Sequence, residues 1–599
     1  MLKKFFLNML SSFVGAWIAL ALFLVSAFLL VIGLAGNMAL SKATQTEQVK
    51  KRSILVIDLS GTIDERESAA EPDIMLLVQG NLQAPQTLDV IVQAIREAAV
   101  NDNIVAISLK CGALSAGPAT LDAIRHELLE FRKTTDGKKK ILAYAGSFSQ
   151  GCYFVASVAD KIYMNPAGEM GLQGLSSSSM YYKGLLDKLG VQFQVVKVGT
   201  YKSAVEPYIL DNMSEPARAQ MDTLLGSMWG YIRSEIASAR KGVTAASVDS
   251  LVSVDYISFA KADKAVKAGL VDSLMYERQY NSRLAEISGR EVDKLNFVSP
   301  RTLVSQSPWA DAYGSKKQIA VLYASGEIAD GNKNQINYED LVPVIVKLAD
   351  DDNVKGLVLR VNSPGGSVYG STQIGEALDY FQSKGKPLAV SMGDYAASGG
   401  YWISANADKI FADPLTITGS IGIFGLLPNF KGTLDKLGVN VATVSTNPGA
   451  AFPNGFKPLD DTQLAVMQKY VDRGYDDFTS RVAKGRRMKK ADVLRIAEGR
   501  VWSASTARRI GLVDSLAYLR NAIDWTASKA GLGDSYDVAA YPEVSPSIWN
   551  MIQLSSTTMG ELKQAVDARD EEFLRTYLLR RILGRKPVQA RMPEFRIQM

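Results

Sequence analysis

Histidine is almost missing from this chain of 599 residues, which contains a single one, His126. Any mechanism that pairs a serine or cysteine with histidine, or that binds a metal through several histidines, must therefore use that residue. Cysteine is nearly as rare: Cys111 and Cys152 are the two present, and neither belongs to a CxxC pair. This scarcity excludes a disulfide framework and a cysteine-rich metal site. It leaves open whether the two cysteines pair with each other.

His126 lies in a segment that has the pattern of an amphipathic helix. The apolar residues that recur at helical spacing are Leu121, Ile124, Leu128 and Phe131. His126 falls off this stripe, so a solvated helix position is predicted for it. A hydrolase built on this sequence would therefore need another general base.

A large excess of either charge is missing as well. The chain has 67 Lys and Arg against 62 Asp and Glu, a net charge of +5, which implies no large nucleic-acid-binding surface. With 47% hydrophobic and 22% charged residues, the composition is that of a globular protein and excludes wholesale disorder. The length predicts two to four domains.

The sequence has one hydrophobic run of membrane-spanning length, and it lies near the N-terminus. No charged residue lies between Lys4 and Lys42, and residues 13–36 are almost all apolar. A spanning helix needs about 20 such residues, whereas the core of a signal peptide has about 7–15. We therefore predict a tail and transmembrane anchor over residues 1–45, with a long cleaved signal peptide as the alternative. Basic residues flank both sides of the run, so the positive-inside rule leaves the orientation open, with a slight lean toward a cytoplasmic body.

The chain also contains an internal duplication. The sequence ADKI occurs at 159–162 and 407–410, and DKLGV occurs at 187–191 and 435–439, both with an offset of 248 residues. GLVDSL recurs with an offset of 242. Because the matches keep their order while the offsets drift slowly, they indicate two copies of one domain.

Each copy alternates short apolar strands with amphipathic helices, which predicts an α/β fold with a largely parallel sheet. We place the first repeat at residues 53–275, a linker at 276–317, the second repeat at 318–545 and a basic amphipathic tail at 546–599. From Phe573 onward this tail has seven Lys or Arg and one acidic residue. We expect it to lie on an anionic membrane surface, and the alternatives are an oligomer contact or a solvated end.

Two features of the second copy have no counterpart in the first. Pro364-Gly365-Gly366 follows a strand, and such a turn exposes backbone N–H groups of the kind that an oxyanion hole needs. Ser398 also follows a strand and begins a helix, where the free N–H groups favour an anionic oxygen. The alternatives are an ordinary turn and an ordinary helix-capping serine. The offset places Gln150 opposite Ser398 in the first copy.

A serine nucleophile needs a base, and with His126 discounted a lysine of lowered pKa is the remaining candidate. Lys202 in the first copy follows a strand and a glycine turn, and the offset places Ala450 opposite it. The serine thus occurs only in the second copy and the lysine only in the first, so each copy holds half of a dyad. A solvated lysine at a helix start is the alternative.

Four motifs, VGTYKSAVEPY, VNSPGGSV, ASGGYW and TGSIGIFG, together resemble the signal peptide peptidase A family in its long, duplicated, membrane-anchored form. The resemblance covers nearly the whole chain. It implies two tandem crotonase/Clp-protease-like domains after one N-terminal transmembrane helix, and a serine peptidase that degrades remnant signal peptides without a metal or cofactor.

Residue by residue, the resemblance makes Ser398 the nucleophile, Lys202 the general base and Ser420 a serine that orients the lysine. It makes the backbone N–H groups of Gly366 and Gly399 the oxyanion donors. It further implies a single-pass protein of the bacterial inner membrane, with the catalytic body on the periplasmic side, that assembles as a homotetramer and acts on apolar peptides.

Two other functions remain compatible with the fold. One is a crotonase-like acyl-CoA enzyme, which would give no reason for a serine and a lysine split between the copies. The other is a non-catalytic membrane scaffold, against which the intact set of Ser398, Lys202 and Gly366 argues.

Overall fold

The structure is a computed structural model that describes residues 49–66, 86–305, 313–331, 335–543, 588–592 and 597–598. The predicted anchor and most of the predicted basic tail lie outside these residues. Within them, no helix is both long enough and apolar enough to cross a membrane.

The first repeat is built on a parallel sheet in the order β10-β6-β4-β3-β1-β11. Its strands are β1 (Ser53–Asp64), β3 (Ile104–Ser115), β4 (Lys140–Ala145), β6 (Lys161–Met164), β10 (Ser273–Leu274) and β11 (Asn296–Val298). Strand β4 is buried at every residue after Lys140, and the first half of β3 is almost fully buried, as expected for a parallel sheet covered on both faces.

The second repeat has the same strand order, β22-β18-β17-β15-β12-β23, and every one of these pairings is parallel. Its strands are β12 (Gln318–Ser325), β15 (Val354–Ser363), β17 (Leu388–Ala397), β18 (Lys409–Ala412), β22 (Ser515–Leu516) and β23 (Asp537–Tyr541). Beyond β17 the sheet continues through β19 (Ile417–Gly419) to β21 (Val501–Ser503), which is antiparallel. The α/β fold and the duplication predicted from the sequence are confirmed.

The segment 276–317, expected to be a linker, contributes structure to the first repeat. It contains α11 (Glu277–Ser288), β11 and α12 (Pro300–Val304). Strand β11 pairs in parallel with β1, as β23 pairs with β12 in the second repeat. The first repeat therefore needs this segment to complete its sheet edge, and the sequence match between the copies was too weak there to show it.

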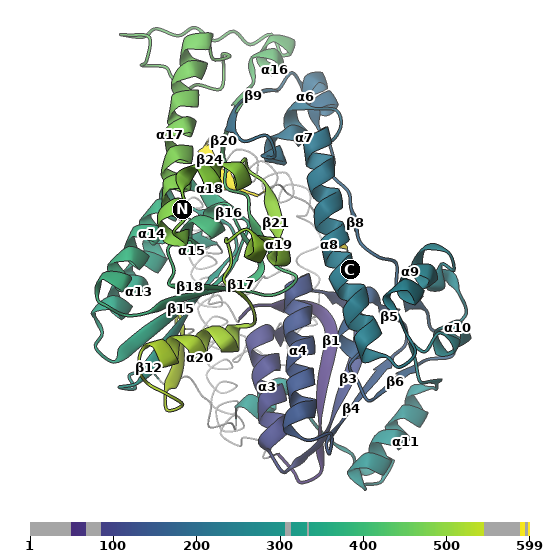
Figure 1. Ribbon diagram of the computed structural model, residues 1–599. Helices are drawn as coiled ribbons and strands as arrows, with labels where there is room; N and C mark the ends of the chain where they lie inside the picture. Colours follow the sequence, from purple (N-terminus) through teal and green to yellow (C-terminus); the bar gives the residue numbers. More distant parts are fainter. Residues whose placement is uncertain are drawn as a thin grey trace, which may run out of the picture. The chain divides into compact units, whose positions relative to one another are not determined.

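Matching helices cover the two sheets. In the first repeat α3 (Leu88–Val100) packs beside α4 (Pro118–Thr134), and in the second repeat α13 (Tyr338–Asp350) packs beside α14 (Val368–Ser383) (Figure 1). Helix α3 buries Ile91, Ala94, Ile95 and Ala98, which share one face of the helix. These helices bury the apolar stripes that the sequence pattern predicts.

A third sheet joins the repeats. Strand β9 (Gln192–Val198) of the first repeat pairs antiparallel with β20 (Ile423–Asn429) of the second, in the register Val198 opposite Ile423. The order of this sheet is β14-β13-β16-β24-β20-β9, where β13 is Ile328–Ala329, β14 is Ile336–Asn337, β16 is Gly365–Ser367 and β24 is Val588–Arg591. Because β9 leads toward Lys202 and β20 follows Ser420, this pairing brings parts of the two repeats together.

Buried polar contacts also connect the repeats. Asp394 of the second repeat accepts hydrogen bonds from the Ala119 N–H (2.7 Å) and the Thr120 hydroxyl (2.8 Å) at the start of α4. Arg360 and Glu65 form an ion pair of 2.8 Å in which both side chains are 4% exposed. Breaking such a buried pair is costly because it leaves an uncompensated charge, so the repeats form one coupled structure rather than two independent domains.

Candidate active site

Ser398 stands at a sharp bend between a strand and a helix. It follows β17 and precedes α15 (Gly399–Ser404), and its φ of 57° is unusual for a residue with a side chain. The bend is held because the Ser398 N–H donates to the Gly419 carbonyl at 2.8 Å, while the Ser398 carbonyl accepts from the Trp402 N–H at 2.8 Å. Such strain costs about 1–3 kcal/mol and is typical of functional positions.

Lys202 reaches this serine from the other repeat. Its Nζ lies 2.8 Å from the Ser398 Oγ. Both residues are 0% exposed. Lys202 precedes the short 3₁₀ helix Ser203–Val205, which follows β9 after a glycine turn. The structure thus brings together the two residues that the sequence divides between the copies.

Ser420 completes a three-residue cluster. The Lys202 Nζ lies 3.1 Å from the Ser420 Oγ and 3.2 Å from the Ser420 carbonyl oxygen. A neutral amine has two N–H donors and one lone pair. With both donors directed to Ser420, the lone pair is free to accept the proton of the Ser398 hydroxyl, so the cluster has the geometry of a nucleophile and its base.

Burial controls the charge of this lysine. The pKa of Lys202 is lowered well below its ordinary value because its ammonium form would be desolvated in the interior. Among the residues that the structure describes, those within hydrogen-bonding distance of its Nζ are two serines, Ser398 and Ser420, and neither carries a charge. A larger share of Lys202 is therefore neutral near physiological pH than for a solvated lysine, as a general base requires.

The rate of turnover should follow this lowered pKa. Because the neutral amine is the active form, we expect kcat/KM to rise with pH and to reach a plateau below about 10.4, where a free lysine would still be titrating. A pH–rate profile of the full chain on a fluorogenic apolar peptide measures this. A rate that is flat from acid to alkaline pH, or that falls as pH rises, would contradict a lysine base.

A loop that the sequence analysis missed supports the lysine. Gly499 packs so tightly against it that an added Cβ would lie 2.7 Å from the Lys202 Cβ, and its φ is +72°. The Tyr201 N–H donates to the Glu498 carbonyl (2.9 Å), and the Ser420 N–H donates to the Arg500 carbonyl (2.7 Å). Residues 498–500 therefore connect the lysine segment with the Ser420 segment, and no sequence motif marked this contact.

The glycine turn of the second repeat is adjacent to this cluster. Gly366 lies in β16 with a φ of +152°, and an added Cβ would lie 2.0 Å from the Ile328 carbonyl oxygen. Gly399 follows Ser398 directly, and Gly400 packs on the backbone of Ser363, at the end of the strand that leads into the turn. The turn and the start of α15 are thus in contact, which suits two backbone donors directed at one carbonyl oxygen.

His126 has a different environment from the one predicted. It lies in α4 as expected, but it is half-buried and its ring stacks on Tyr518 of the second repeat, with ring centroids 3.8 Å apart. Burial lowers the pKa of its imidazole. The prediction of a solvated position is therefore corrected: the helix packs against the other repeat, which periodicity within one repeat cannot show.

Replacing His126 by glutamine should leave turnover almost unchanged, because the hydrogen-bond partners of the Lys202 amine are the two serines of the cluster. The lost ring stack should cost about 0.5–1.5 kcal/mol of stability. Thermal unfolding and peptide turnover of His126→Gln would measure both effects. A hundredfold loss of kcat in a folded variant would restore histidine to the mechanism.

The two cysteines are free thiols and do not form a disulfide bond with each other. The Cys152 Sγ approaches the Leu59 carbonyl at 3.6 Å, and the Cys111 Sγ approaches the Cys152 carbonyl at 3.9 Å. Among the residues that the structure describes, no cluster of His, Cys, Asp and Glu has the arrangement of a metal site.

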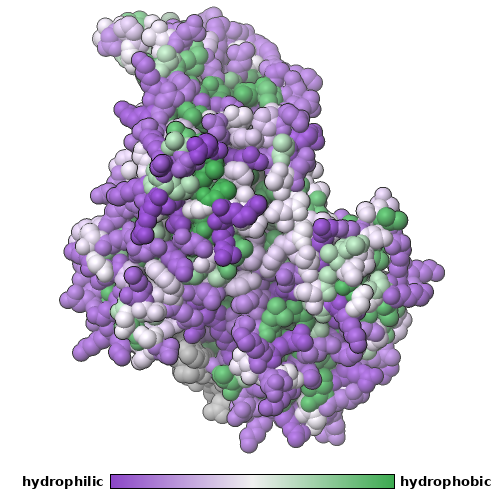
Figure 2. Space-filling view, in the orientation of Figure 1, coloured by the Kyte–Doolittle hydropathy of each residue, from purple (hydrophilic) through white to green (hydrophobic). Residues whose placement is uncertain are grey.

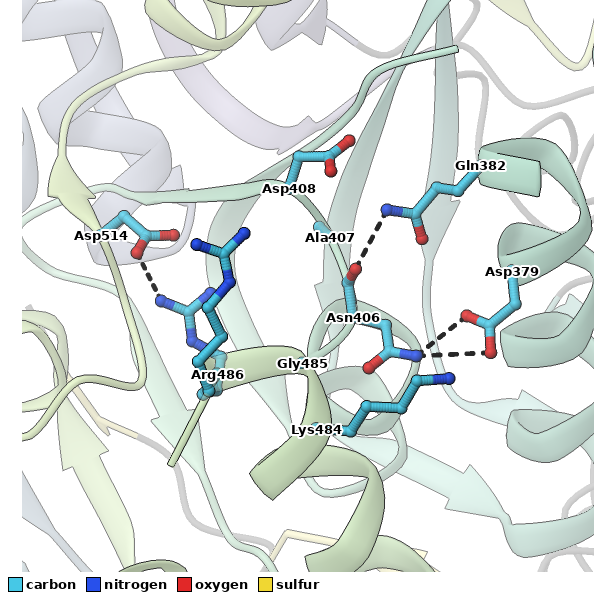
Figure 3. A pocket seen from close by; sticks show the side chains of 10 residues that line it. Asp379, Gln382, Asn406, Ala407, Asp408, Lys484, Gly485, Arg486 and Asp514 are labelled. Atoms are coloured by element: carbon cyan, nitrogen blue, oxygen red, sulfur yellow. Dashed lines mark hydrogen bonds and ion pairs between the residues drawn. The ribbon is translucent and has the colours of Figure 1, made fainter. Parts of the chain in front are cut away.

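A concave region of the second repeat has a polar lining. This pocket of about 390 Å³ lies between α14, β18 and the end of α17 (Asp461–Arg486) (Figure 3). Two of its lining carboxylates have partners within the lining: Asp514 pairs with Arg486, and Asp379 accepts a hydrogen bond from the Asn406 amide. Because these pairs connect elements of the second repeat and the lining includes neither Ser398 nor Lys202, we assign the pocket a structural role.

A buried serine within hydrogen-bonding distance of a buried lysine, on an α/β scaffold with glycine-rich backbone beside it, is the arrangement that a serine hydrolase of the Ser-Lys type requires. The model of peptidase family S49 matches residues 133–291 and 380–533, and a Clp protease model matches residues 311–414. The chain belongs to peptidase family S49, and it is a serine peptidase.

Relatives agree with this assignment. The chain is 38% identical to Protease 4 of Haemophilus influenzae, over 67% of this chain and 66% of that protein. It is 35% identical to Protease 4 of Salmonella typhi, over 90% of this chain and 88% of that protein. The chloroplastic serine protease SPPA of Arabidopsis thaliana is 26% identical, over 81% of this chain and 70% of that protein.

Proposed function

We propose that Ser398 is the nucleophile and Lys202 the general base of a peptidase that cuts extended apolar peptides, remnant signal peptides among them. The observation that carries this proposal is the 2.8 Å contact between the Lys202 amine and the Ser398 hydroxyl in a fully buried site. An acyl-CoA enzyme or a scaffold would have no use for this pair.

The mechanism follows from the contacts. Neutral Lys202 takes the proton of Ser398 as its Oγ attacks the peptide carbonyl, and Ser420 holds the amine in place. The N–H groups of Gly366 and Gly399 stabilise the oxyanion. Lys202 then gives the proton to the leaving amine, and the same lysine deprotonates the water that releases the acyl-enzyme.

The substrate class follows from the surroundings of the serine. The residues next to Ser398 are Ala396, Ala397, Gly399 and Gly400, which leave room for an extended backbone with apolar side chains. A protein of Enterococcus faecium named as a putative signal peptide peptidase SppA is 37% identical over 227 residues, 37% of this chain and 66% of that protein. Its name supports signal peptides as the natural members of this class.

The same proposal includes a location and an assembly. The apolar run at residues 13–36 would anchor the chain in the inner membrane, with the catalytic body on the periplasmic side, and the basic tail would contact anionic lipid. Apolar side chains are exposed around α6 (Lys183–Leu189) and α16 (Lys431–Lys436), among them Leu185, Leu189, Leu437 and Val444. Figure 2 shows hydrophobic residues among hydrophilic ones in this part of the surface. Such a surface suits contacts between subunits of a homotetramer.

The substrate class is tested with matched synthetic peptides. One carries a signal-peptide apolar core, and the other has the same length with lysines replacing alternate core residues. We expect the full chain to cleave the first at least about tenfold faster, because each lost apolar contact costs about 1–3 kcal/mol. Mass spectrometry identifies the products. Equal cleavage of both peptides would contradict the proposal. So would no cleavage of either peptide together with a Ser398 that does not react with a fluorophosphonate.

A further inference from the structure

The residues that precede the general base lie against a turn of the second repeat. This turn, residues 498–500, leads into β21. The Glu498 Oε2 accepts hydrogen bonds from the Thr200 N–H and the Thr200 hydroxyl, both at 2.9 Å. The Glu498 carbonyl accepts the Tyr201 N–H, also at 2.9 Å. One residue of the second repeat thus binds both residues that directly precede Lys202.

The backbone at this contact has an unusual conformation. Glu498 has a φ of 55°, in the left-handed region that residues with side chains rarely adopt. Ser398 and Ser420 share this conformation, with φ values of 57° and 51°. Gly199 approaches so closely that an added Cβ would lie 2.5 Å from the Glu498 carbonyl oxygen. Because such strain gathers at functional sites, where the surrounding structure enforces it, the conformation of Glu498 points to a role in the site.

Arg500 binds the same segment through its side chain. Its guanidinium carbon lies 4.8 Å from the centroid of the Tyr201 ring and 4.4 Å from that of the Trp502 ring. The negative face of an aromatic ring attracts a guanidinium at such distances. The Arg500 carbonyl also accepts the Ser420 N–H at 2.7 Å. Arg500 therefore connects the residue before the general base with the serine that contacts the amine of the base.

The turn also covers one side of the lysine. Gly499 packs on the backbone and Cβ of Lys202 with no space for a side chain of its own, and the Gly499 N–H donates to the Ile421 carbonyl at 2.8 Å. Burial is what lowers the pKa of the Lys202 amine. A turn that moved away would admit water to the amine and return its pKa toward that of a free lysine.

Building on the proposed function, we propose that Glu498 and Arg500 are positioning residues that hold the general base in place from the second repeat. They act through Thr200 and Tyr201, because the hydrogen-bond partners of the Lys202 amine are serines. The two halves of the dyad are then held together twice, once by the pairing of β9 with β20 and once by this turn.

The test is steady-state kinetics of the full chain on an apolar peptide. Glu498→Ala removes the acceptor of both Thr200 hydrogen bonds, and Arg500→Ala removes the stack on Tyr201. We expect each variant to lose kcat/KM about tenfold to hundredfold at neutral pH, the scale for a misplaced catalytic group. The loss should shrink severalfold at about pH 10, because a more solvated Lys202 regains its neutral form there. A loss of the same size at both pH values would show general destabilisation and would overturn the proposal.

Two further variants are controls. Glu498→Gln keeps a side-chain oxygen that can accept both bonds from Thr200, so it should restore most of the kcat/KM that Glu498→Ala loses. Arg487 has the same φ of 55° and is an exposed residue at the end of α17. Arg487→Ala should therefore keep the original kcat/KM and pH profile. An equal loss in Arg487→Ala and Glu498→Ala would assign the effect to backbone strain and contradict a positioning role.

A double-mutant cycle tests whether Glu498 acts through Thr200. Thr200→Val removes the hydroxyl donor and keeps the backbone N–H. Combined with Glu498→Ala, it should lower kcat/KM no further than Glu498→Ala does alone, because residues that share one contact show non-additive losses. Fully additive losses would mean that the two residues act independently, against the proposal.

Hydrogen–deuterium exchange separates this inference from the proposed function, since it needs no cleavage. The Tyr201 amide keeps its backbone acceptor in Glu498→Ala, so faster exchange at this amide reports that the whole segment has loosened. We expect exchange across residues 198–203 to be about tenfold faster in Glu498→Ala and Arg500→Ala, with β15 unchanged. Faster exchange in a chain that cleaves no peptide would leave the hold on the segment intact and sink the catalytic proposal. Unchanged exchange and unchanged kcat/KM in both variants would overturn the positioning role.

Discussion

Ser398→Ala and Lys202→Met should each reduce peptide turnover by about 10⁴-fold or more, and the double variant should lose little beyond either single one. Residues that act as one unit show such non-additive losses. The reason here is the 2.8 Å contact between the two side chains, since either one alone has no partner for proton transfer. Steady-state kinetics on an apolar peptide, with product analysis by mass spectrometry, would measure this. Near-native turnover of Lys202→Met at neutral pH would refute the dyad.

The same lysine should make the free energy of unfolding depend on pH. Its folded pKa lies below its unfolded value because of burial, so the unfolded state binds more protons between those two values. Stability of the unsubstituted chain therefore falls as pH decreases from about 10.4 to the lowered pKa. Lys202→Met lacks this titration. Its free energy of unfolding, relative to that of the unsubstituted chain, should therefore rise as the pH decreases through that window. Denaturant unfolding at several pH values checks the sign, and an opposite trend would mean that Lys202 is charged in the folded protein.

Gly366→Ala should be the next most damaging substitution, with a loss of about 10²–10³ in kcat, the cost of one oxyanion donor. The added methyl would lie 2.0 Å from the Ile328 carbonyl oxygen, so β16 must move away from β13. The backbone conformation, with a φ of +152°, is also one that alanine rarely adopts. The expected change is a lower kcat in a protein that still folds.

The matched control for this substitution is Gly385→Ala. Gly385 also has a positive φ, of +76°, but an added Cβ there meets no atom within 4 Å. It should lose some stability through backbone strain alone, at most about 1–3 kcal/mol, while its kcat stays near the original. If both variants lost the same kcat, the effect at Gly366 would reflect general destabilisation and not the oxyanion site.

Much of the architecture is predictable from the sequence because it depends on local patterns. Short apolar strands alternating with amphipathic helices specify a parallel α/β sheet, and ordered repeats specify two copies. The strand-to-helix position of Ser398 and the glycine turn at Gly366 are readable for the same reason, since glycine and strand ends mark sharp bends. The difference between the copies at Ser398 and Lys202 was also visible without coordinates.

Only the tertiary structure determines the contacts between segments that are far apart in the chain. The sequence offers Lys202 and Ser398 separately, and the pairing of β9 with β20 is what puts their side chains 2.8 Å apart. The loop at Gly499, the stacking of His126 on Tyr518, the strand β11 in the presumed linker and the place of β24 beside Gly366 are of the same kind. Periodicity reports which face of an element is buried, but it carries no information on the partner that buries it. That choice depends on packing and strand pairing across hundreds of residues.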